Sequence, residues 1–161
     1  MRKSVPVLVI FLILASGCRP AVEEEATACP VTIKPEWPFV PPQPWPAEPP
    51  QDDRYWFGDA GLWAALPANG EWTQLAKGEK FLLWSEEFDV REDETPDFVL
   101  RATRLDGEAA PFQSSRTTNA YENSIQWAML TGVKLPAPGC WAFSATYKEH
   151  ELAFVLHVPQ E

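Results

Sequence analysis

Alternation of apolar and polar residues is the strongest signal in this chain, and it is clearest between residues 136 and 158. Apolar side chains occupy every second position there, in two runs: Trp141, Phe143, Ala145 and Tyr147, then Leu152, Phe154, Leu156 and Val158. Successive side chains of a strand point to opposite faces, so each run would present one apolar face. The polar residues Lys148-Glu149-His150 separate the runs. We therefore expect an antiparallel hairpin with one buried face.

Shorter apolar runs predict further strands upstream. They flank residues 58–61 and recur at 62–66, 72–75, 81–84 and 98–103. Asn69-Gly70 is a strong two-residue hairpin signal, because both residue types tolerate positive φ, and it predicts that 62–66 pairs with 72–75. Residues 121–130 fit either a strand or one helical turn, and the charged residues 86–97 should form a loop.

No segment shows a long helical period. About seven to eight short strands, separated by turn residues, predict an all-β fold for residues 55–161, an antiparallel β-sandwich. The long strand that begins at Pro138-Gly139-Cys140-Trp141 looks like the penultimate strand of an immunoglobulin-like domain.

Residues 1–17 have the character of an export signal. Arg2 and Lys3 precede an apolar run, Val5 to Leu14, that is too short to span a bilayer. Ala15-Ser16-Gly17-Cys18 follows and resembles the lipobox of bacterial lipoproteins, which implies cleavage before Cys18 and its acylation, with palmitate or a similar chain. Such a lipid group would anchor the protein stably to a membrane. The alternative is an ordinary cleaved signal peptide and a soluble secreted protein.

A proline-rich tether is expected at residues 18–54, which hold more than half of the chain's 17 prolines. Proline fixes φ and donates no hydrogen bond, so the tether should be extended and stiff. Trp37, Phe39 and Trp45 are large apolar residues for a solvated linker, and they indicate that part of the tether wraps across the domain.

Cys29 and Cys140 remain once Cys18 is assigned to lipid. An exported chain lies in an oxidising compartment, where two cysteines allow one intramolecular disulfide. Two buried free thiols are the alternative, and zinc would need more ligands.

Loss of Arg2 and Lys3 with the signal leaves 11 basic against 23 acidic residues, a formal charge of −12. This charge argues against nucleic acid and anionic lipid as partners.

Signs of catalysis are weak, and we expect neither an enzyme nor a cofactor. His150 and His157 read as a loop residue and an outward strand residue. The chain has no Gly-x-Ser-x-Gly elbow, no phosphate-binding glycine loop and no HExxH. The carboxylates of residues 86–97 share one loop, so they do not make a facing glycosidase pair. A solvated loop is favoured over a calcium site, because the spaced aspartates of such sites are missing.

The chain's eight tryptophans are candidates for core or for a ligand surface. Trp63, Trp84 and Trp141 read as core from their strand positions. The remaining candidates for a ligand surface are Trp37, Trp45, Trp56 and Trp72.

A set of motifs occurs in order: CPVT at 29–32, LWAAL at 62–66, TRLDG at 103–107 and PGCWAFSATY at 138–147. The chain thereby resembles a group of uncharacterised bacterial extracellular proteins that share CPVT, LW, RLDG and GCW motifs. The resemblance implies a Cys29–Cys140 disulfide, because these cysteines recur together in the group, and it implies no activity.

These observations predict a cell-envelope lipoprotein whose domain is a non-catalytic protein-interaction or adhesion module. The alternative is a carbohydrate-binding module that uses exposed tryptophans. Arg19, instead of aspartate, follows Cys18, which favours the outer membrane or cell surface over the inner membrane.

Overall fold

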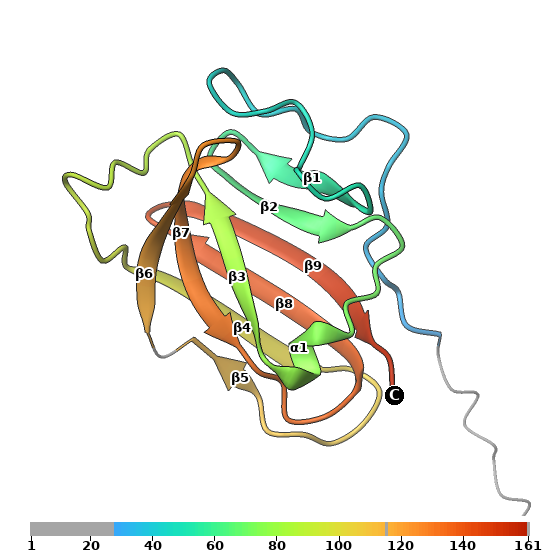
Figure 1. Ribbon diagram of the computed structural model, residues 1–161. Helices are drawn as coiled ribbons and strands as arrows, with labels where there is room; N and C mark the ends of the chain where they lie inside the picture. Colours follow the sequence, from blue (N-terminus) through green and yellow to red (C-terminus); the bar gives the residue numbers. More distant parts are fainter. Residues whose placement is uncertain (1–27, 115, 161) are drawn as a thin grey trace, which may run out of the picture.

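The computed structural model describes residues 28–114 and 116–160, so the expected signal segment and Cys18 lie outside the described part. Two antiparallel sheets pack face to face (Figure 1). The five-stranded sheet has the order β1-β2-β3-β7-β6 and the four-stranded sheet the order β5-β4-β8-β9. The strands are β1 Arg54–Asp59, β2 Leu62–Pro67, β3 Glu79–Trp84, β4 Phe98–Arg104, β5 Phe112–Gln113, β6 Thr117–Glu122, β7 Gln126–Val133, β8 Gly139–Tyr147 and β9 His150–Val158.

The predicted all-β sandwich is confirmed, with nine strands in the described residues where seven to eight were expected. The C-terminal hairpin is also confirmed, since β8 and β9 pair over their whole lengths from Gly139↔Val158 to Tyr147↔His150. The apolar side chains of β8 and β9 face the five-stranded sheet and form part of the core between the two sheets. Phe154 stacks there on Phe143 and Phe81, with ring centroids 5.0 and 5.8 Å apart. This hairpin is the element against which the rest of the sandwich packs.

The predicted pairing of 62–66 with 72–75 is wrong. β2 pairs with β3 instead, and residues Gln74–Lys77 form the short helix α1. Gly70 does have positive φ, 73°, but its turn directs the chain toward β9, where the Gly70 carbonyl accepts a hydrogen bond from the His157 N–H at 2.9 Å. Trp72 and Leu75 are thereby buried in the core, at 6% and 0% exposure. The burial of Trp72, just before α1, and of Leu75, within it, has overridden the local preference for a hairpin.

Residues 121–130, which fitted either a strand or a helical turn, belong to the hairpin of β6 and β7. Tyr121 pairs with Trp127 and Glu122 with Gln126 around the short turn 123–125, in which Ile125 is buried. β6 was not predicted because its sequence, TTNAYE, has no apolar alternation. It is an end strand and needs no continuous apolar face. The expected loop at 86–97 is confirmed, since no helix or strand lies there.

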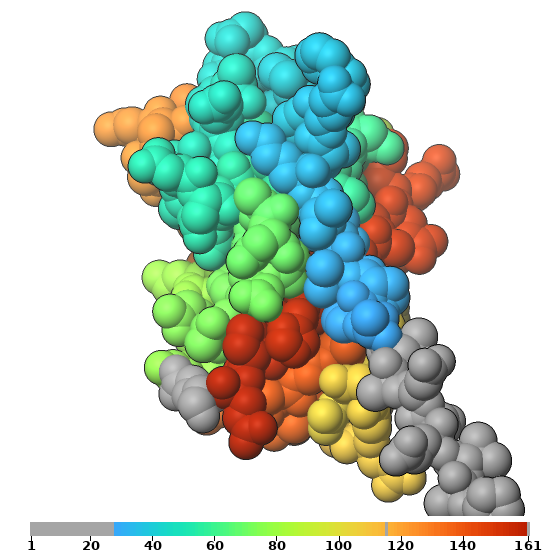
Figure 2. Space-filling model, turned by 90° about the vertical axis from the view of Figure 1, so that its right-hand side faces the viewer, coloured from blue at the N-terminus to red at the C-terminus, as the bar shows by residue number. Residues whose placement is uncertain are grey.

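The proline-rich segment from residue 28 to 53, called the arm here, lies against the sandwich. Figure 2 shows it running along one side of the molecule. Thr32 bonds to the edge of β9 twice: its N–H donates to the Val155 carbonyl at 2.8 Å, and its hydroxyl oxygen accepts from the Val155 N–H at 2.9 Å. The Lys34 N–H donates to the Ala68 carbonyl at 3.0 Å. The arm's aromatic residues had indicated this packing.

Candidate functional site

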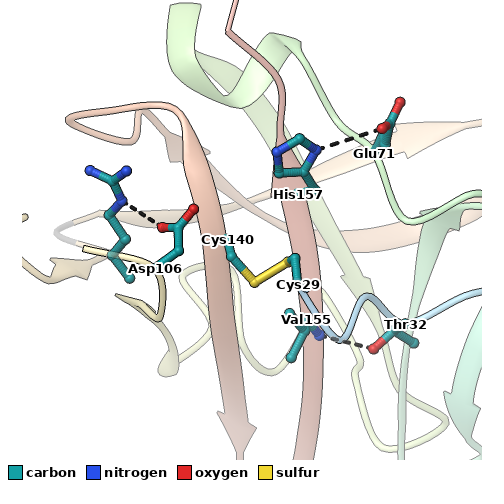
Figure 3. Close-up of a disulfide and its surroundings, with 8 residues drawn as sticks. Cys29, Thr32, Glu71, Asp106, Cys140, Val155 and His157 are labelled. Atoms are coloured by element: carbon teal, nitrogen blue, oxygen red, sulfur yellow. Dashed lines mark hydrogen bonds and ion pairs between the residues drawn. A yellow bond between two sulfur atoms is a disulfide. The ribbon is translucent and has the colours of Figure 1, made fainter. Parts of the chain in front are cut away.

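A disulfide joins the arm to the sandwich. Cys29 and Cys140 are bonded, with Cα atoms 5.5 Å apart and a sequence separation of 111, as predicted (Figure 3). Cys140 lies at the start of β8 and is 1% exposed. On neighbouring β9, the Thr32–Val155 bond lies to one side of the disulfide and the His157–Glu71 ion pair, at 3.6 Å, to the other. The arm is therefore held to β8 covalently and to β9 by hydrogen bonds.

A second buried aromatic cluster covers the outer face of the five-stranded sheet. Trp56, Trp63 and Trp84 project from β1, β2 and β3 on the face opposite the main core. The arm supplies the cover: Phe39 and Trp45 lie with their ring centroids 5.6 and 5.1 Å from that of Trp63. β1 and β2 are thus apolar on both faces because both faces are covered.

Two of the four candidate ligand tryptophans are buried, which corrects that part of the prediction. Trp56 is 1% exposed, and its indole N–H donates to the Pro46 carbonyl of the arm at 2.9 Å. Trp72 is 6% exposed beneath the Arg54 guanidinium, which lies 3.9 Å from its ring centroid. Trp45 is half-buried in the outer cluster. Trp37 alone of the four is open to solvent, with 84% of its surface exposed.

An exposed aromatic pair lies on the β6–β7 hairpin. Tyr121 and Trp127 are directly opposite each other in the ladder, with ring centroids 5.0 Å apart, and remain 52% and 41% exposed. Trp127 shares its face of β7 with Met129, which is fully buried. Trp127 is exposed although Met129 is buried, because the end of the β6–β7 hairpin projects beyond the four-stranded sheet (Figure 1). The sequence offered one signal for this pair: two aromatics placed around a polar turn are typical of cross-strand neighbours.

An acidic loop lies beside this pair. The Asn119 side-chain amide, two residues before Tyr121, donates to the Glu94 carbonyl at 2.7 Å. The Tyr147 hydroxyl, at the end of β8, donates to Asp93 at 3.3 Å. The loop carries one basic residue, Arg91, and seven acidic ones: Glu86, Glu87, Asp89, Glu92, Asp93, Glu94 and Asp97. The two contacts fix the loop across the end of the sandwich, next to β6.

The loop's carboxylates differ in their partners. Hydrogen bonds from Arg91 lower the pKa of Asp89 to about 2. A hydrogen bond to His150, together with Lys148, lowers the pKa of Glu87. Glu92 and Glu94 are exposed, and Glu92 lies in the electrostatic field of Arg91. In the same part of the chain, no three His, Cys, Asp or Glu side chains are grouped closely enough to hold a metal ion.

The two histidines lie at opposite ends of β9, each beside a carboxylate. His150 Nε2 lies 2.9 Å from a Glu87 carboxylate oxygen, and His157 pairs with Glu71. The side-chain partners of both histidines in the described residues are glutamates, and both cysteines there are in the disulfide.

Comparison of the chain with protein-family models, curated proteins and solved structures gives no match. The resemblance to the group with CPVT and GCW motifs therefore stays a prediction. No helix in residues 28–114 or 116–160 is long and apolar enough to cross a membrane.

Proposed function

We propose that this protein is a bacterial cell-envelope lipoprotein, anchored through Cys18, that presents its β-sandwich as a non-catalytic protein-interaction module. One observation carries the proposal: the arm is fixed at one end of the sandwich, while the exposed aromatic pair and free strand edge lie at the other. Arg19 after Cys18 favours the outer membrane or cell surface as the site of anchoring.

The distances suit presentation away from a membrane. Cys18 and Cys29 are separated by few enough residues that the linking segment spans at most roughly 40 Å when fully extended. Cys140 and Tyr147 mark the two ends of β8, about 23 Å apart at the rise of a strand. The disulfide thus places the anchored segment at one end of β8, and the acidic loop contacts the other.

The end of the sandwich that carries the β6–β7 hairpin has side chains suited to a protein contact. Tyrosine and tryptophan bury large apolar areas while keeping a polar group for hydrogen bonding, and both are enriched where proteins bind each other. β6 is an end strand, so one row of its backbone groups has no strand partner among the described residues. An open strand edge beside exposed aromatic rings is the arrangement that accepts a partner segment.

Glycan binding has less support from the geometry. Of the eight tryptophans, Trp37 and Trp127 are the exposed ones, and they lie on the arm and on β7. The Tyr121 and Trp127 rings are tilted by 47° to each other and so do not form one flat platform. A groove of about 320 Å³ is lined by Trp56, Trp72 and Trp84. All three rings are buried, and the indole N–H groups of Trp56 and Trp84 already donate to backbone carbonyls.

Site-specific photo-crosslinking in the bacterial envelope tests the proposal. A photoreactive phenylalanine analogue replaces Trp127 in one variant and the exposed Glu108, in the loop after β4, in a matched control. We expect a discrete protein adduct from position 127 and little from position 108, with the protein in the membrane fraction. A Cys18→Ser variant should lose acylation and leave that fraction. Equal adducts at both positions would contradict the interaction surface, and a polysaccharide adduct would favour the carbohydrate-binding alternative.

A further inference from the structure

We propose that β6, the Tyr121–Trp127 pair and the acidic loop form one binding surface, the acidic edge, which takes an extended Lys- or Arg-rich segment of a partner protein as an added strand. This inference rests on the proposed interaction function and specifies the chemistry of the partner.

The first argument concerns strand edges. Proteins protect exposed edges with lysine, proline, bulges, short strands or covering chain. Here β9 is covered by Thr32 and by Trp72, whose N–H donates to the His157 carbonyl at 2.9 Å. β5 has only two residues, and β1 is kinked at Gly58, where φ is 128°.

β6 has none of these protections among the described residues. Its six residues, TTNAYE, include no lysine and no proline, and one edge has no neighbouring strand. Six residues of strand extend roughly 20 Å, long enough for a peptide to add several main-chain hydrogen bonds. An unprotected edge of this length is what strand addition needs.

The second argument concerns charge. Asn119 of β6 bonds to the backbone of Glu94, so the acidic loop lies directly beside the strand. Glu92 and Glu94 are exposed, with Glu92 in the field of Arg91. Glu122 adds a further exposed carboxylate at the strand's end, where it accepts a hydrogen bond from the Ser124 N–H. Exposed Arg116 precedes β6, so a cationic segment would gain attraction mainly along residues 119–122, where an acidic one would be repelled.

The aromatic pair favours the same partner. A lysine or arginine side chain can lay its methylene stem across an exposed ring and place its cation over the ring face or beside a carboxylate. Trp127 and Tyr121 offer such rings on the hairpin that the acidic loop contacts through the Asn119–Glu94 hydrogen bond. A second copy of this chain is disfavoured as the occupant, because two acidic edges would meet.

Peptide binding to the purified, disulfide-bonded domain tests the inference. The probe is a fluorescently labelled peptide of about eight residues, sufficient to span β6, in which lysine alternates with threonine or valine. We expect fluorescence anisotropy to show binding that weakens as salt rises. The same peptide with glutamate for lysine should not bind. A copy N-methylated on alternate backbone nitrogens should also fail, because it cannot form the ladder.

Charge reversal supplies matched variants. Glu92→Lys with Glu94→Lys should weaken binding of the lysine peptide by about tenfold. Glu36→Lys with Glu108→Lys makes the same change in net charge at exposed positions on the arm and in the loop after β4, and should weaken it far less. Trp127→Ser should weaken it as well, with the thermal unfolding midpoint measured for every variant.

Several results would overturn the inference: no binding of the lysine peptide, equal binding of the glutamate or N-methylated peptide, equal effects of the two charge reversals, or concentration-dependent self-association through β6. If position-dependent crosslinking at Trp127 persisted in any of these cases, the interaction surface would stand and its partner would not be a cationic strand. Loss of that crosslinking would instead remove the proposed function itself.

Discussion

Tyr55 shows how one buried residue makes the stability of this domain depend on pH. Its side chain is 2% exposed, its hydroxyl has no hydrogen-bond partner in the described residues, and burial raises its pKa to about 12. The pKa of an unfolded-chain tyrosine is about 10. The folded state therefore holds this proton more tightly, and the stability that results is complete below pH about 10 and lost as pH rises toward about 12.

We predict that Tyr55→Phe makes the free energy of unfolding less dependent on pH between about 10 and 12. At neutral pH the substitution should be nearly neutral or stabilising, because it removes an unpaired buried hydroxyl without changing the ring. Denaturant unfolding at several pH values measures both effects.

Tyr147→Phe is the control for this prediction. Burial, with Asp93 nearby, also raises the pKa of Tyr147 to about 12, but its hydroxyl donates a hydrogen bond to Asp93. Its removal should reduce the same pH dependence and also destabilise the domain at neutral pH. A Tyr55→Phe variant that is clearly destabilised at neutral pH would show that this hydroxyl is hydrogen-bonded after all.

The arm is the element whose role the structure clarifies most. It covers the outer face of the five-stranded sheet with Phe39 and Trp45 and is joined to β8 by the disulfide. Without the disulfide, the packing of these rings and a few backbone hydrogen bonds would hold it. We therefore expect the disulfide to strengthen the packing of the outer aromatic cluster, beyond what these non-covalent contacts provide.

We predict that the double variant Cys29→Ala and Cys140→Ala loses up to about 4–5 kcal/mol of unfolding free energy, because a link across more than a hundred residues strongly restricts the unfolded chain. Release of the arm should also expose Trp63 and Trp56, which shifts tryptophan emission to the red and increases quenching by iodide. Proteolysis should cut first in residues 28–53. Unchanged quenching would mean that ring packing alone holds the arm.

The strands that could be predicted from sequence are those buried on at least one face. β8 and β9 alternate apolar and polar residues over most of their length, so both their existence and their inward positions followed from the pattern. β6 was missed because an end strand without a continuous apolar face leaves no such pattern. Residues 72–75 were misassigned because the burial of Trp72 and Leu75 is a long-range effect that the local Asn69-Gly70 signal does not contain.

The candidate site was harder to predict for a related reason. The disulfide followed from a cysteine count, because two cysteines allow one pairing. The surface of Tyr121 and Trp127 depends on the hairpin projecting past the opposite sheet, which the spacing of residues along the chain does not reveal. From the sequence, Trp56 is a candidate for a ligand surface, because its burial depends on the arm folding back over β1, which its sequence position does not reveal.

At the scale of the whole molecule, the two ends of the sandwich differ in character. One end holds the disulfide and, through the arm, the segment that leads back to Cys18. The other holds the β6–β7 hairpin and the acidic loop (Figure 1). Since the chain's formal charge is −10, and −12 without Arg2 and Lys3, an anionic membrane surface would repel the body of the domain, and the acidic end most strongly. Attachment and charge should together orient the acidic edge away from the membrane.

This orientation can be measured by energy transfer from a dye on the acylated protein to acceptor lipids in vesicles. Position 108 lies two residues after Asp106, which packs near Gly139 and Cys140 at the disulfide end of the sandwich. Position 122 is the last residue of β6, at the turn into β7. We predict that Glu108→Cys labelled with the donor transfers energy more efficiently than Glu122→Cys, because position 108 lies toward the disulfide and position 122 toward the acidic loop, and β8 spans about 23 Å between those two ends. Transfer should fall further at position 122 when the vesicles carry anionic lipid, and high salt should reverse that fall by screening the repulsion. Equal transfer from both positions would mean that the sandwich lies along the membrane, with the acidic edge no farther from the bilayer than the disulfide.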